Sequence, residues 1–142
     1  MKNRGLLQLS LLLLLVGCEI KPEKINYGTD ACHFCKMTIV DTQHAAQFVT
    51  TKGKAYKFDA IECMVNQLKS WDGPKIKLTL VSDYSNQAEL IDAKDATYLI
   101  SESIPSPMGA FLSSFKKKEN AERIKSESGG EILTWTQLQS KL

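Results

Sequence analysis

The chain has 142 residues, a formal net charge of +2 and 43% hydrophobic residues, enough for one compact domain or two small ones. The excess of positive charge belongs to the first seventeen residues, because Lys2 and Arg4 fall there and no acidic residue does. The remainder is formally neutral, and its densest charged run, residues 116–120, is typical of a solvated helix face. The composition therefore gives no support for nucleic-acid binding.

Residues 1–17 have the pattern of a bacterial secretory signal peptide. A short basic start precedes a leucine-rich run that is too short for a comfortable membrane span. The run ends in Leu-Val-Gly-Cys, which resembles a lipobox, although a chance cysteine after an ordinary signal peptide is the alternative. Acyl chains such as palmitate on Cys18 would anchor the chain at a membrane surface without spanning it. Residues 18–30 are polar and are expected to form the lipidated N-terminal tether.

Residues 31–84 are predicted to form a first subdomain of ββαβ type. The alternation of apolar and polar residues indicates strands, and the spacing of Ile61, Met64, Val65 and Leu68 indicates a helix that begins after Asp59 as its N-cap. The expected elements are strands over 36–41, 45–53, 54–59 and 75–84, with a helix over 60–71 between the last two.

Residues 85–142 are predicted to form a second subdomain with a similar order of elements. The expected elements are a strand over 96–103, a loop over 104–111, a mostly helical stretch over 110–128, a strand over 131–135 and a closing helix over 136–142. Little residue identity connects the two halves, so the repeat is one of architecture. The predicted fold class is α+β, with mostly antiparallel sheets.

The segment DACHFCKMTIVD, residues 30–41, contains the spacing C-x-x-C-x-M at Cys32, Cys35 and Met37. With Cys18 acylated, the exported chain keeps three cysteines, an odd number that disulfides within one chain cannot consume. The third is Cys63, on the predicted helix, where we expect a buried or half-buried thiol. At least one thiol is therefore free or bound to something else.

Two common roles of a C-x-x-C pair fit this context poorly. A thioredoxin-like pair precedes a helix whose N-terminus lowers one thiol pKa, whereas a strand-like segment follows here. A structural zinc site needs four ligands, and the sequence has no second C-x-x-C or spaced histidine pair. The remaining donors are Cys63, His33, which could be a nitrogen ligand or exposed, and His44, expected at the surface.

Monovalent copper suits the motif better, because it accepts a few soft sulfur ligands. On an extended strand Cys35 and Met37 would point to the same side. Methionine is also a common core residue, so packing is the alternative role for Met37. A disulfide between Cys32 and Cys35 would disable such a site until it is reduced.

Met108 is a second candidate ligand, in the segment Pro107-Met108-Gly109 of the predicted loop. Loops are where sites are displayed, although Met108 could instead pack a helix start onto the sheet. The chain has no nucleophile-elbow pattern, acid–base pair or glycine-rich phosphate loop, so we predict no enzyme activity.

Together these features resemble the NosL family, copper-binding accessory lipoproteins of nitrous oxide reductase maturation. The matching segments are the lipobox, DACHFCKMTI, KFDAIECM, and PMGAF followed by GGEILTW. The resemblance implies two related ββαβ subdomains, with copper ligands at Cys35, Met37 and Met108 and with Cys32 as an auxiliary ligand. The chain departs from the family pattern at Lys36, where many members have glycine.

The resemblance also implies a Cu(I) metallochaperone that is lipid-anchored to a bacterial membrane, inner or outer, and faces the periplasm. Its expected partners are nitrous oxide reductase, the denitrification enzyme whose copper–sulfide centre it would supply, and a membrane ABC-type assembly complex. Metal binding could also join two chains in a dimer. Two other functions stay open: a periplasmic thiol–disulfide oxidoreductase that uses Cys32 and Cys35, and a metal-free lipoprotein scaffold.

Overall fold

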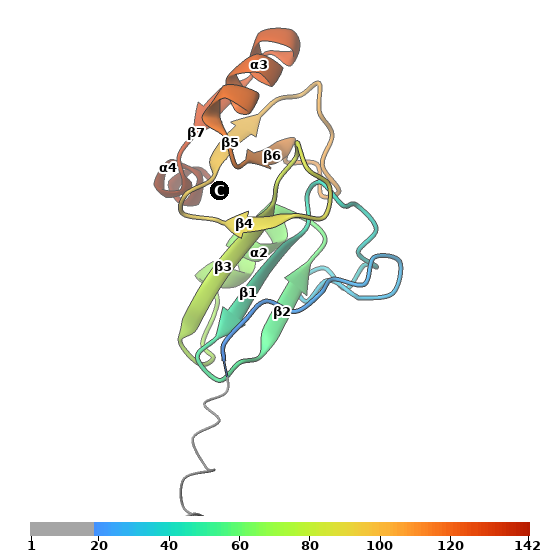
Figure 1. Cartoon of the computed structure of the whole chain (residues 1–142), viewed down its shortest axis with the longest axis vertical. Coiled ribbons are helices and arrows are strands. Elements are labelled where there is room, and N and C mark those ends of the chain that lie inside the picture. Colours follow the sequence, from blue (N-terminus) through green and yellow to red (C-terminus); the bar gives the residue numbers. More distant parts are fainter. Residues whose placement is uncertain (1–18) are drawn as a thin grey trace, which may run out of the picture.

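Two antiparallel sheets, each with its own helix, make up the part of the chain that the computed structural model describes, residues 19–142 (Figure 1). The predicted signal peptide and Cys18, the predicted lipidation site, lie outside the described residues. No helix within residues 19–142 is long and apolar enough to cross a membrane. The elements in chain order are β1 (Ala46–Thr50), β2 (Ala55–Phe58), α2 (Ile61–Lys69), β3 (Ile76–Ser82), β4 (Leu90–Asp92), β5 (Thr97–Ile100), β6 (Leu112–Phe115), α3 (Lys118–Ser128), β7 (Glu131–Leu133) and α4 (Trp135–Lys141).

The two sheets repeat one topology. In the first unit, β1 is central and pairs antiparallel with β2 and with β3, the strand that follows helix α2. In the second unit, β5 is central and pairs antiparallel with β6 and with β7, which follows α3. The predicted α+β class with two related ββαβ units is therefore confirmed. β4 lies in the half predicted as the second subdomain, and it pairs with β3 at the edge of the first sheet.

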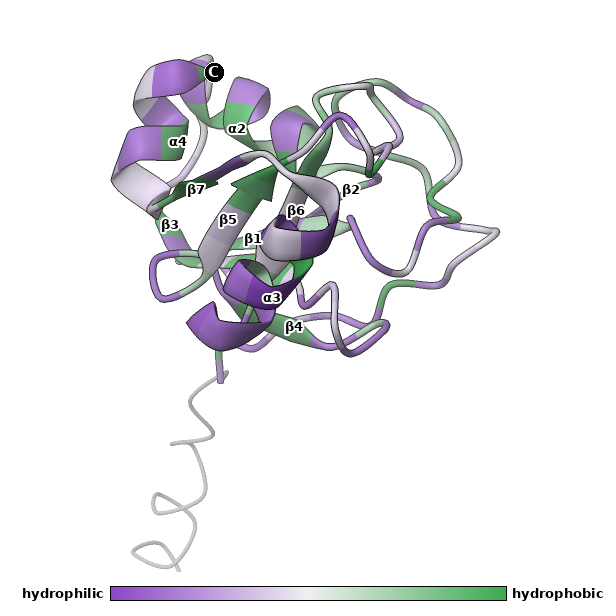
Figure 2. Cartoon of the chain, turned by 90° about the horizontal axis from the view of Figure 1, so that it is seen from above, coloured by the Kyte–Doolittle hydropathy of each residue, from purple (hydrophilic) through white to green (hydrophobic). Residues whose placement is uncertain are grey.

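Burial on both faces explains why β1 occupies the middle of the first sheet. All five of its residues are buried, and Phe48 packs against an aromatic cluster on β2 and after α2. Helix α2 contacts β1, β2 and β6, so it lies between the two units. One continuous core therefore contains residues of both halves, from Ile25 to Leu138. Figure 2 shows α3 as mostly hydrophilic, in keeping with Ala121 as its buried residue.

Two predicted elements are wrong. Residues 36–41 form no strand, because Lys36 adopts a positive φ of 68° and only Ala31 and Thr38 form an isolated bridge. The helix expected over 110–128 begins only at Lys118, and residues 112–115 form strand β6 instead. All four residues of β6 are buried, and the Ser114 hydroxyl donates to the Ser82 carbonyl at 2.5 Å, which removes the cost of burying its polar group.

A buried histidine connects the two units, against the expectation that His44 lies at the surface. Its Nδ1 lies 2.9 Å from Asp41 Oδ2, and its Nε2 lies 3.2 Å from Ser113 Oγ on β6. The order Ser–His–Asp is that of a hydrolase triad. However, Ser113 is fully buried, so no substrate reaches its hydroxyl, and we interpret the three residues as a polar link between the units.

The connection between α3 and β7 depends on Gly130, whose φ is 108°, and a Cβ there would collide with the Ile100 carbonyl on β5. Gly53, in the β1–β2 turn, also has a positive φ, 79°, but a Cβ there meets nothing within 4 Å. We expect Gly53→Ala to lower the free energy of unfolding by about 1 kcal/mol. Gly130→Ala should lower it by about 3 kcal/mol or more, since the collision adds to the strain.

Urea unfolding followed by tryptophan fluorescence measures both losses. Similar losses in the two variants would mean that the α3–β7 connection moves away from β5 without cost.

Candidate metal centre

Three thiols and one carboxylate converge at the end of β2 and the start of α2. One ligand atom each from Cys32, Cys35, Asp59 and Cys63 lies within 4.8 Å of every other. All three cysteines are free. Cys32 and Cys63 are buried, as is Asp59, while Cys35 is half-buried and provides the access from solvent. We call these four residues the thiol cluster.

The first two thiols come from a closed loop. Cys32 N donates to the Met37 carbonyl at 2.7 Å, and the Cys32 carbonyl accepts from Lys36 N at 3.0 Å. The positive φ of Lys36 allows the chain to turn back within this short span, and glycine adopts that conformation more readily. His33 N donates to the Lys57 carbonyl at 2.8 Å, which docks the loop on β2 beside Asp59.

The carboxylate and the third thiol come from the start of α2. Asp59 and Cys63 are four residues apart, so a helical turn brings them to one side. The Cys35 S–H donates to Asp59 Oδ1 at 3.3 Å. Asp59 was expected as the N-cap of α2, but the cap residue is Ala60, without a side-chain hydrogen bond. The Asp59 carboxylate contacts the thiol cluster instead.

Hydrogen bonds separate the protonation states of the three thiols. Donation from the Cys63 side chain, helped by the backbone N–H groups of Asp59 and Cys35, lowers the pKa of Cys32 from 9.0 to about 6. Burial raises the pKa of Cys35 to about 11. The pKa of Cys63 is also raised, chiefly because its proton is shared with Cys32. The lowered pKa makes Cys32 the thiol of the cluster that most readily forms a thiolate.

This order is unfavourable for thiol–disulfide exchange. In oxidoreductases the reactive cysteine combines a low pKa with exposure, so that its thiolate can attack a substrate disulfide. Here the low-pKa residue, Cys32, is fully buried, and the accessible Cys35 has the raised pKa. Three soft sulfur donors, of which Cys32 loses its proton most readily, suit a soft metal ion better.

The predicted thioether ligands lie at the surface. Met37 is 55% exposed at the end of the Cys32 loop, and Met108 is 43% exposed. Because residues 36–41 form no strand, a shared strand face does not explain how Cys35 and Met37 would act together. The ligand roles of Met37 and Met108 stay predictions.

Neither histidine belongs to the thiol cluster in the described chain. The ring of His33 packs edge-on against Tyr56, with 4.7 Å between ring centroids, and His44 is paired with Asp41 and Ser113. Sequence reasoning identified Cys32 and Cys35 but did not assign Asp59 or Cys63 to a site. The available signal was the D-x-x-x-C spacing across a helix start, together with the odd number of cysteines.

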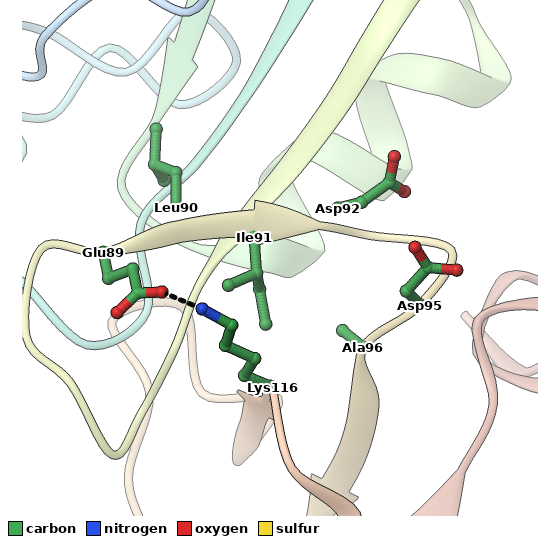
Figure 3. Close-up of a pocket in the computed structure, with 7 residues that line it drawn as sticks. All are labelled: Glu89, Leu90, Ile91, Asp92, Asp95, Ala96 and Lys116. Atoms are coloured by element: carbon green, nitrogen blue, oxygen red, sulfur yellow. Dashed lines mark hydrogen bonds and ion pairs between the residues drawn. The ribbon is translucent and has the colours of Figure 1, made fainter.

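A separate cavity of about 250 Å³ lies between β4 and the strands of the second unit (Figure 3). Its lining residues are Glu89, Leu90, Ile91, Asp92, Asp95, Ala96 and Lys116. Glu89 and Lys116 are paired at 2.6 Å across it, and no cysteine, histidine or methionine lines it. The cavity does not contain the donors that the predicted chemistry requires.

Comparisons with known proteins agree with the resemblance seen in the sequence. The sequence model of the NosL family matches residues 24–142. The copper-binding lipoprotein NosL of Stutzerimonas stutzeri is 27% identical, over 90% of this chain and 75% of that protein. The crystal structure of the copper chaperone NosL from Shewanella denitrificans has a TM-score of 0.70 and 23% identity, over 82% of this chain and 93% of that one, which shows a common fold.

The hydrogen bond from Cys63 to Cys32 can be tested by pH titration of the thiolate absorbance in the ultraviolet. The wild-type chain should show one transition near pH 6, from Cys32. Cys63→Ala removes the donor and should move this transition upward, towards the ordinary value of 9.0. Cys63→Ser keeps a donor and should leave the transition low. If the alanine and serine variants titrate alike, the hydrogen bond is not the cause of the low pKa.

Proposed function

The chain belongs to the NosL family, and on that premise we propose that it binds copper as Cu(I) and passes it on as a metallochaperone. The observation that carries this proposal is the convergence of three free thiols, two of them buried and one half-buried. Cu(I) prefers thiolate and thioether ligands, whereas magnesium and calcium prefer oxygen ligands. The names of the two relatives, a copper-binding lipoprotein and a copper chaperone, support the same cargo.

The proposed ligands are Cys35, Met37 and Met108, with Cys32 as an auxiliary. Cys63 joins them because its sulfur lies in the thiol cluster. A chaperone must bind its metal and also release it. The different solvent exposure of these side chains suits both tasks. The buried thiols would keep the metal from water, whereas Cys35 and the exposed methionines would be the ligands that a recipient protein reaches first.

The exposed apolar side chains support a docking surface at the same place. In residues 19–142 the exposed large hydrophobic residues are Phe34, Met37, Val40 and Met108. Three of them lie on or just after the loop that carries Cys32 and Cys35. We propose that this surface receives the copper acceptor, nitrous oxide reductase or its membrane ABC-type assembly complex, so that transfer occurs away from water.

The proposed location follows from the N-terminal segment. A lipid on Cys18 would hold the folded part at a bacterial membrane, facing the periplasm, by way of the residues that precede the family match at residue 24. The relative from Stutzerimonas stutzeri is named a lipoprotein, which supports this arrangement.

Anaerobic Cu(I) titration in competition with a chelator tests the proposed ligands. Cys35→Ser should abolish tight binding, because it removes the sulfur that connects the buried thiols with the surface. Met37→Leu and Met108→Leu keep the side-chain volume and remove the thioether, and each should weaken binding about tenfold or more.

Met64→Leu is the matched control, because Met64 is a fully buried core residue of α2. Its Cu(I) affinity should equal that of the wild-type chain. Wild-type affinity in Cys35→Ser and in both surface methionine variants would overturn the proposed site.

A further inference from the structure

A buried carboxylate on the residue next to Cys63 has no part in the binding described so far. Glu62 lies in the first turn of α2 and is only 4% exposed. Its Oε1 accepts a hydrogen bond from Ser106 Oγ at 2.7 Å and another from Ala110 N at 3.3 Å. Both donors belong to the second unit, so Glu62 connects α2 with the segment that carries Met108.

That segment is a tight turn built to present Met108. Gly109 N donates to the Ser106 carbonyl at 3.0 Å, which closes a β-turn with Pro107 and Met108 at its two central positions. Serine at the first position, proline at the second and glycine at the fourth are the residues that a type I turn prefers. The Glu62 carboxylate holds residues at both ends of this turn and leaves Met108 exposed at its tip.

The same helical turn also carries part of the thiol cluster. Glu62 directly precedes Cys63 and follows Asp59 by three residues. The Met108 turn is therefore fixed to the backbone that fixes the Cys63 sulfur. Few rotatable bonds separate the two, because the carboxylate is bonded at both ends of the turn and the helix is rigid.

A purely structural role explains Glu62 poorly. Acidic residues in the first turn of a helix favour its dipole, but an exposed glutamate gives that benefit without burial. Glu62 Oε2 is buried and has no hydrogen-bond partner in the described chain, which costs free energy. An apolar side chain would fill the same space without this cost, but it could not hold the two donors of the Met108 turn.

We propose that Glu62 is a positioning residue that sets Met108 beside the thiol cluster, so that copper held by the first unit takes a thioether ligand from the second. This inference rests on the proposed function. In this proposal Glu62 does not contact the metal. Its effect on copper affinity depends wholly on the Met108 sulfur.

A double-mutant cycle on Cu(I) affinity tests this dependence. Glu62→Ala and Met108→Leu should each weaken binding about tenfold, and the double variant should be no weaker than either one. Glu62→Gln keeps the accepting oxygen and should restore most of the affinity. X-ray absorption at the copper edge should show the same loss of a sulfur neighbour in Glu62→Ala as in Met108→Leu.

Two results would overturn the proposal. One is wild-type affinity in Glu62→Ala while Met108→Leu binds weakly, and the other is a double variant in which the two losses multiply. If Glu62→Ala fails to fold, Ser106→Ala replaces it in the cycle, because it removes one of the two bonds and leaves the carboxylate. Wild-type affinity in Met108→Leu would also overturn it, whereas Cys35→Ser separately decides whether the chain binds copper at all.

Discussion

The first turn of α2, together with Asp59 just before its cap, is the constraint on which the rest of the site depends. Asp59 accepts from the Cys35 thiol, Cys63 donates to the Cys32 sulfur, and Glu62 holds the Met108 turn. Two segments that are distant in sequence, the loop with Cys32 and Cys35 and the Met108 turn, thus meet on one rigid element. Because α2 also contacts β1, β2 and β6, it belongs to the continuous core, and the site takes its rigidity from that core.

Burying two carboxylates at the start of α2 costs free energy, and in this site each of them fixes the position of another segment. Asp59 and Glu62 are 3% and 4% exposed, and each accepts hydrogen bonds from a different segment. Core residues of similar size would stabilise the fold more but would fix none of these partners. The protein therefore gives up stability where it must place side chains accurately.

The pattern of apolar and polar residues predicted the strands in which they alternate and the helix in which apolar residues recur every three or four positions. The strand expected over 75–84 and the helix expected over 60–71 both exist, as β3 and α2. Prediction failed where tertiary contacts determine the secondary structure. The serines of β6 have a low intrinsic preference for strands and form one only because they are paired in the core. The positive φ of Lys36 is a backbone conformation that the residue type lysine does not predict. The cysteine motif identified half of the thiol cluster, whereas Asp59 and Cys63 join it only through the packing of α2 against the Cys32 loop.

The two units share the order of three strands, and the connection between the first two of them is much longer in the second unit. Residues 51–54 join β1 to β2, whereas residues 101–111 join β5 to β6 and contain the Met108 turn. An insertion at a strand connection leaves the ladder on either side unchanged. This connection carries Met108, the proposed thioether ligand, at a place outside both ladders. An engineer could therefore vary the exposed Met108 at the tip of the turn and leave in place the buried Ser101, Ile104 and Ser106, which fix the segment to the scaffold.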